Sequence, residues 1–71
     1  MPSIDLEAER DRALQTIFIA INKMDPLSDD LAHAIGTDQK TATRLIRREN
    51  IGNMKTKWLI AKAKLLKRYA V

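Results

Sequence analysis

The stretch LAHAIGTDQKTATRLIRR, residues 31–48, decides the fold of this chain. Apolar residues recur at steps of three and four on both sides of Gly36, which is the spacing of one face of an α-helix. Glycine adopts a positive φ with little strain, so it suits the place where one helix ends and the chain turns sharply. Thr37 can then cap a second helix from about residue 38 to 48. The stretch predicts two short helices joined by a very tight turn.

Two helices joined in this way form a helix-turn-helix unit. The apolar residues that fall on the mutually facing sides of the two helices are Leu31, Ala32, Ile35, Ala42, Leu45 and Ile46. The polar residues on the outward side of the second helix, or at its N-terminal tip, are Gln39, Lys40, Thr43, Arg44 and Arg47. We therefore expect the first helix to support the second and to leave its polar side exposed.

Helical spacing continues before this unit. Apolar residues at steps of three and four predict a helix from about residue 5 to 23, and they are Leu14, Ile17, Phe18, Ile21 and Met24. Pro26 interrupts that helix, because proline disfavours the helical conformation of the preceding residue and has no amide donor. Ser28 is a good N-cap for the first helix of the unit, which we expect from about residue 29 to 35.

The unit is followed by a loop, ENIGN at 49–53, and by a last helix over about 55–69 for which Asn53 is a plausible cap. The residues expected on the apolar side of that helix are Trp58, Leu59, Leu65, Leu66 and Tyr69. No stretch alternates in the way of a β-strand. The sequence predicts one all-α domain over residues 1–71, with four or five helices including the helix-turn-helix.

The composition is that of a soluble globular domain, with 45% hydrophobic and 31% charged residues in a chain of 71. Cysteine is absent, which excludes disulfides and thiolate chemistry and fits a reducing cytosolic compartment. No apolar run approaches the roughly 18 residues of a membrane span, and the charged start MPSIDLEAERDR is unlike a signal peptide. We expect a cytoplasmic protein without membrane contact.

Charge is divided unevenly along the chain. Residues 1–30 carry seven acidic and three basic side chains, net −4, whereas residues 31–71 carry two acidic and ten basic ones, net +8. A basic half of this kind is typical of a surface that meets an anionic partner.

The side chains of the second helix indicate what that partner is. Glutamine pairs with adenine, and arginine or lysine with guanine, in the major groove of DNA. The residues that we expect to read bases are Gln39, Lys40, Thr43 and Arg44. Further along the helix phosphate contacts become more probable than base contacts. The residues that we expect to meet phosphates are Thr37, Arg47, Arg48 and a stripe on the last helix made of Lys57, Lys64 and Arg68.

This stretch resembles the helix-turn-helix of the lambda repressor and Cro class of phage regulators. In that class Leu-Ala is followed by two variable residues, an aliphatic residue, glycine and a capping residue, and often by glutamine before an aliphatic pair. The matching positions are Leu31, Ala32, Ile35, Gly36, Thr37, Gln39, Ala42 and Leu45. Ala42 departs from the valine or isoleucine that the class more often has.

The segment RALQTIFIAINKM at 12–24 and the basic last helix are similar in layout to the lambda CII type of activator, so the likeness covers most of residues 12–66. The resemblance implies a lambda repressor-like fold. It also implies a phage or bacterial transcription regulator, either repressor or activator, that works in the host cytoplasm on the nucleoid.

Catalysis is not expected. The sequence has no plausible triad, no metal-binding cluster and no glycine-rich phosphate loop, so we expect neither an enzyme nor a cofactor, metal or small-molecule substrate. His33 is expected on the surface, and the acidic pair at 29–30 suits the positive end of a helix dipole. Trp58 and Tyr69 at helical spacing are more typical of a core than of a base-stacking platform.

The hypothesis from sequence is therefore sequence-specific binding of double-stranded DNA by a homodimer that reads two half-sites about one helical turn apart. Ile19 and the segment LLKRYAV at 65–71 are the candidate dimer surfaces. Two alternatives remain open. One is a small helical interaction module, such as an antitoxin or an inhibitor of a host protein, in which the two-helix unit is only a scaffold. The other is an RNA-binding protein that uses the same basic stripe.

Overall fold

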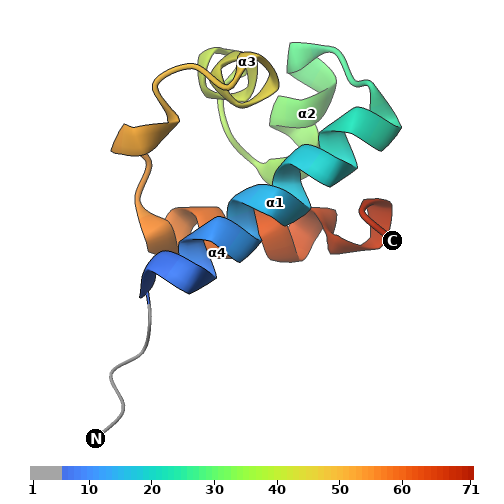
Figure 1. The fold of residues 1–71 in the computed structure, drawn as a ribbon. Helices are drawn as coiled ribbons and strands as arrows, with labels where there is room; N and C mark the ends of the chain where they lie inside the picture. The colour runs from blue at the N-terminus through green and yellow to red at the C-terminus, as the bar shows by residue number, and fades with distance from the viewer. Residues whose placement is uncertain (1–5) are drawn as a thin grey trace, which may run out of the picture.

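Four α-helices follow one another along residues 6–71, the part of the chain that the computed structural model describes (Figure 1). They are α1 (Leu6–Met24), α2 (Ser28–Ile35), α3 (Gln39–Arg47) and α4 (Thr56–Leu66). Two short 3₁₀ helices, η1 (Ile51–Asn53) and η2 (Lys67–Tyr69), flank α4. Residues 6–71 contain no strand, which confirms the all-α fold; the predicted start of the first helix at residue 5 lies outside the described part.

The helices pack as two pairs. α1 lies along α4, and α2 packs against α3. Figure 1 shows α1 crossing the middle of the molecule, with α2 and α3 above it and α4 below. The two pairs meet through contacts of α2 with α4 and of α1 with α3. No helix among residues 6–71 is long and apolar enough to cross a membrane.

One hydrophobic core joins the two pairs, because every helix contributes to it. The largest fully buried side chains are Ile17, Leu31, Ile35, Leu45, Leu59 and Leu66. Burying an aliphatic side chain of this size contributes about 1.5–3 kcal/mol. The core therefore fixes the position of α3 relative to the rest of the molecule.

Two predicted apolar faces differ from the observed ones. In α1 Ile17 and Ile21 are buried as predicted, and Ala13 and Ala20 are buried beside them. The other predicted residues, Leu14, Phe18 and Met24, are only half-buried and pack against the edge of the core. In the C-terminal region α4 ends at Leu66 and the chain tightens into η2, rather than continuing as one helix to 69 as predicted. As a result, 52% of Leu65 and 36% of Tyr69 are exposed.

The start and end of each helix explain the turns. Gly36 has φ +69° and ends α2, as predicted, and its amide and that of Thr37 both donate to the Ala32 carbonyl. The cap of α3 is Asp38, whose carboxylate accepts from the Thr41 amide at 2.8 Å. The prediction that Thr37 caps this helix was wrong by one residue, because three residues rather than two make the turn.

Two other predicted caps were wrong. Leu27 occupies the cap position of α2, so Ser28 is already helical and its hydroxyl is not used for capping. Lys55, not Asn53, precedes α4, because Asn53 belongs to η1. Neither Leu27 nor Lys55 makes a side-chain cap, so packing rather than capping sets where these helices begin.

Candidate nucleic-acid interface

α3 packs against α2 with its apolar face. Ala42 and Leu45 are fully buried and Ile46 is half-buried, and the α2 residues facing them are buried as well. The mutually facing set predicted from the sequence is thereby confirmed. Since the inner face is fully used in packing, the outer face of α3 is what the molecule presents to a partner.

The outer face carries a row of Lys40, Thr43 and Arg47. Steps of three and four place these residues on one side of the helix. Lys40 and Arg47 are exposed, and neither makes a hydrogen bond or ion pair within residues 6–71. The Thr43 hydroxyl donates to the Gln39 carbonyl at 2.9 Å, which fixes its rotamer. The row therefore presents two exposed cations on either side of an ordered hydroxyl.

Gln39 lies at the N-terminal tip of α3 and is exposed. Its Nε2 donates to the Ser28 hydroxyl at 3.1 Å, so the first residues of α2 and α3 are joined. A primary amide has two N–H donors and a carbonyl acceptor. After this bond Gln39 retains one N–H and its carbonyl oxygen in a fixed orientation.

Arg44 does not share the environment of the outer row. It is half-buried rather than outward as predicted, and its Nη2 donates to the Asn50 carbonyl. Its Nε is buried without a hydrogen-bond acceptor in the described part of the chain. Arg44 thus anchors the turn after α3, because the guanidinium reaches back over that turn.

Arg44 also lines a hollow beside α3. The hollow is bordered by Thr37, Thr41, Arg44, Asn53, Met54, Lys55 and Trp58. Hydroxyl, amide and cationic groups are the side chains that bind phosphate oxygens in nucleic-acid complexes. The sequence predicted nucleic-acid contacts for Thr37 and Arg44 of this set, but not for Thr41, Asn53 and Lys55, which line the same hollow.

Asn53 and Lys55 are held in place from α1. The Arg10 guanidinium donates to the Met54 carbonyl, to the Ile51 carbonyl at 2.8 Å and to the Thr56 hydroxyl at 3.4 Å. These contacts fix the backbone on both sides of Asn53 and Lys55. No local pattern indicates them, since the acceptors are mainly backbone carbonyls more than forty residues away in sequence.

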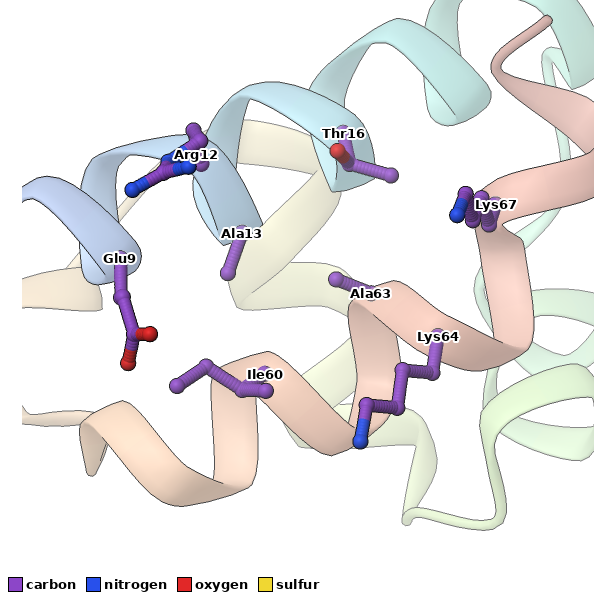
Figure 2. Close-up of a pocket in the computed structure, with 8 residues that line it drawn as sticks. All are labelled: Glu9, Arg12, Ala13, Thr16, Ile60, Ala63, Lys64 and Lys67. Carbon is purple, nitrogen blue, oxygen red and sulfur yellow. The ribbon is translucent and has the colours of Figure 1, made fainter.

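The other predicted phosphate contacts are dispersed. Arg48 stacks on α1, with its guanidinium carbon 4.4 Å from the centre of the Phe18 ring. Lys57 is exposed on α4, and Arg68 donates to the Tyr69 hydroxyl at 2.9 Å. Lys64 lines a groove between α1 and α4 (Figure 2). None of these four residues borders the hollow beside α3.

Electrostatics at the tip of α3 favour an ionised Asp38. The Thr41 side chain, and next the Thr41 amide, hydrogen-bond to this carboxylate and lower the pKa of Asp38 below its ordinary value, with a smaller contribution from Lys40. Asp38 therefore stays charged at neutral pH and offsets part of the positive charge at the start of α3.

Residues 6–71 contain no group of three or more histidine, aspartate or glutamate side chains that could hold a metal ion. Compared with models of protein families, with curated proteins and with solved structures, the chain shows no match.

Proposed function

We propose that this chain binds double-stranded DNA sequence-specifically and regulates transcription, with α3 lying in the major groove. The observation that supports this most is the division of α3 into a buried apolar face and an outer row in which Lys40 and Arg47 are exposed and Thr43 is half-buried. The major groove, about 12 Å wide, admits an α-helix presented in this way. In helix-turn-helix proteins the N-terminal part of the second helix contacts base edges.

Gln39 and Lys40 are the residues proposed to read bases first. The Ser28 bond leaves Gln39 the N–H and the carbonyl oxygen that a bidentate contact with adenine requires. Lys40 is free to reach guanine, and the Thr43 hydroxyl lies next to it along the groove. Each good bidentate contact contributes roughly 1–3 kcal/mol of discrimination against a wrong base.

Phosphates on one side of the groove are proposed to meet the hollow beside α3. Arg44 belongs to this set rather than to the base-reading set, because the Asn50 carbonyl holds its guanidinium at the edge of the helix. Lys55 is exposed and adds a second cation. Contacts of this kind fix the register of the protein on DNA without reading sequence.

Two copies are proposed to bind two half-sites about 34–36 Å apart, since one unit covers only a few base pairs. Ile19 on α1 is 37% exposed and Leu65 on α4 is 52% exposed, so each helix offers an apolar residue for pairing of copies.

Selection of binding sites from a random duplex pool tests the proposal, because it reports both specificity and half-site spacing. On the selected site we expect Gln39→Ala and Lys40→Ala each to lose about 5- to 150-fold in affinity, which corresponds to 1–3 kcal/mol. Each should also relax the preference at one base pair. Lys23→Ala is the matched control, since Lys23 is an exposed cation in the last turn of α1 and belongs neither to α3 nor to the hollow beside it. Neutralisation of about six phosphates gives a slope near −5 for log affinity against log salt.

Three results would count against DNA reading. If no sequence is enriched, or if Gln39→Ala and Arg44→Ala both leave DNA affinity unchanged, the two-helix unit is a scaffold for protein contacts. If duplex RNA of equal length binds as well as DNA, α3 is not the reader, because the major groove of A-form RNA is too narrow for a helix.

A further inference from the structure

A second surface lies between α1 and α4, in the groove drawn in Figure 2. Its floor is apolar and consists of Ala13, Ile60 and Ala63. Ala13 and Ala63 are small, so the two helices leave a hollow where larger side chains would fill the space. Ile60 is half-buried and presents part of its aliphatic side chain to that hollow.

Three cations stand around this floor. Arg12 comes from α1, Lys64 from α4 and Lys67 from η2, and all three are exposed. Within residues 6–71 none of them makes a hydrogen bond or an ion pair, although Glu9 lies on the same rim. The groove therefore combines an apolar floor with an excess of two positive charges.

The groove is separate from the surface proposed for DNA. No residue of α3 or of the hollow beside it lines the groove. Figure 1 shows α3 at the top of the molecule, whereas α4 lies in its lower half, where α1 crosses in front of it. A ligand of α3 consequently leaves the groove accessible.

We propose that this groove docks an acidic amphipathic helix of a partner protein. The apolar side of such a helix covers Ala13, Ile60 and Ala63, and its carboxylates meet Arg12, Lys64 and Lys67. Helix-in-groove recognition reads apolar anchors spaced three or four residues apart, and complementary charge sets orientation and specificity. A nucleic acid fits less well, because a phosphate backbone has no apolar side to cover this floor. This docking does not depend on DNA binding.

A defined peptide provides the test. The probe is a fluorescent 15-residue helix with leucines on one face and glutamates on both flanks, titrated with the full chain. At 1.5 Å per residue it is about 22 Å long, enough to span the 11 residues of α4. A peptide of the same composition with the leucines scrambled around the helix is the control ligand. We expect saturable binding of the first peptide only, weakening as salt is raised.

Variants locate the contact. Lys64→Glu is expected to weaken peptide binding by about fivefold or more, because attraction becomes repulsion. Lys23→Glu makes the same change of net charge on an exposed α1 residue outside the groove and is expected to change it less than about twofold. Thr16→Trp fills the groove without a change of charge and should likewise weaken binding by about fivefold or more, with folding checked by circular dichroism.

Other outcomes overturn the proposal. Equal binding of both peptides, or equal losses in Lys64→Glu and Lys23→Glu, would mean that only net charge attracts the probe. A doubling of mass in solution that Lys64→Glu abolishes would assign the groove to a second copy of the chain. Displacement of the peptide by duplex DNA would assign the groove to the DNA-binding surface. If the chain binds the peptide but fails to bind DNA, the docking proposal is supported and only the proposed DNA function is rejected.

Discussion

The two connections on either side of α3 are built in different ways. The leading connection, residues 36–38 between α2 and α3, is stabilised by its own residues. Gly36 takes the left-handed conformation, and Asp38 caps the helix that follows. The trailing connection, residues 48–55, has left-handed residues at Arg48 and Asn50 and a 3₁₀ helix between them and α4. Arg44 of α3 holds its first part through the Asn50 carbonyl, and Arg10 of α1 holds its second part from outside.

This difference shows which residues of the sequence determine the position of α3. Its N-terminal end is fixed by residues next to it in sequence, so the turn forms wherever this stretch is helical. Its C-terminal end is also capped locally, at Arg48, but the segment that leads from there to α4 depends on a side chain from the other helix pair. Weakening one connection should therefore have consequences that weakening the other does not.

The largest effect is expected for Arg10→Ala. The substitution leaves the carbonyls of Ile51 and Met54 without their donor, and hydrogen bonds to a charged group contribute about 1.5–3 kcal/mol each when partly buried. We expect the free energy of unfolding to fall by about 3 kcal/mol, the lower end for two such bonds, in urea titrations followed by circular dichroism. Arg12→Ala is the control, as Arg12 is exposed and makes no hydrogen bond within residues 6–71. Equal losses in the two variants would show that Arg10 does not hold the trailing connection.

A smaller effect is expected at the leading connection for Gly36→Ala. A Cβ at Gly36 meets nothing within 4 Å, so the cost comes only from the positive φ of +69°. For an alanine this conformation costs about 1–2 kcal/mol. Gly52→Ala is a matched control, because it too has open space around it but no positive φ. Comparing the thermal unfolding of the two variants isolates the free-energy cost of the positive φ. If Gly52→Ala lowers the stability as much as Gly36→Ala does, the cost does not come from the positive φ at Gly36.

The smallest effect is expected for the charge of Asp38. Its pKa is lowered in the folded chain, so its contribution to stability is fully present above the ordinary aspartate pKa of 3.8 and is lost as the pH falls through the lower folded value. Asp38→Asn retains a capping side chain but cannot titrate. The stability difference between the parent and this variant should thus shrink on going from pH 7 to pH 3. A difference that stays constant over this range would exclude a charged cap.

Most of the fold could be predicted from sequence, because it rests on local signals. Helical spacing located the facing residues of α2 and α3, and Gly36 located the turn between them. The cap of α3 was misplaced because Thr37 and Asp38 are adjacent and both residue types cap helices well. The hydrogen bonds from Arg10 to the carbonyls of Ile51 and Met54 could not be predicted, because every residue has a backbone carbonyl and the sequence does not show which ones are used.

The candidate site was predictable in part for the same reason. Lys40, Thr43 and Arg47 share a face by spacing alone. Arg44 has nearly the same place in the helical repeat, yet the Asn50 carbonyl draws it aside. Lys55 and Asn53 become neighbours of α3 only through the trailing connection, so nothing in their own surroundings in sequence marks them.

Trp58 gives the molecule a built-in optical reporter. It is the single tryptophan of the chain, it is half-buried, and it borders the hollow that also contains Arg44 and Lys55. Indole emission responds to the polarity and quenching of its immediate environment. A ligand that enters beside α3 changes that environment, whereas one that settles between Ala13 and Ala63 contacts a different side of α4. The emission wavelength and intensity of Trp58 in the unlabelled protein can therefore distinguish a ligand beside α3 from a ligand in the groove between α1 and α4.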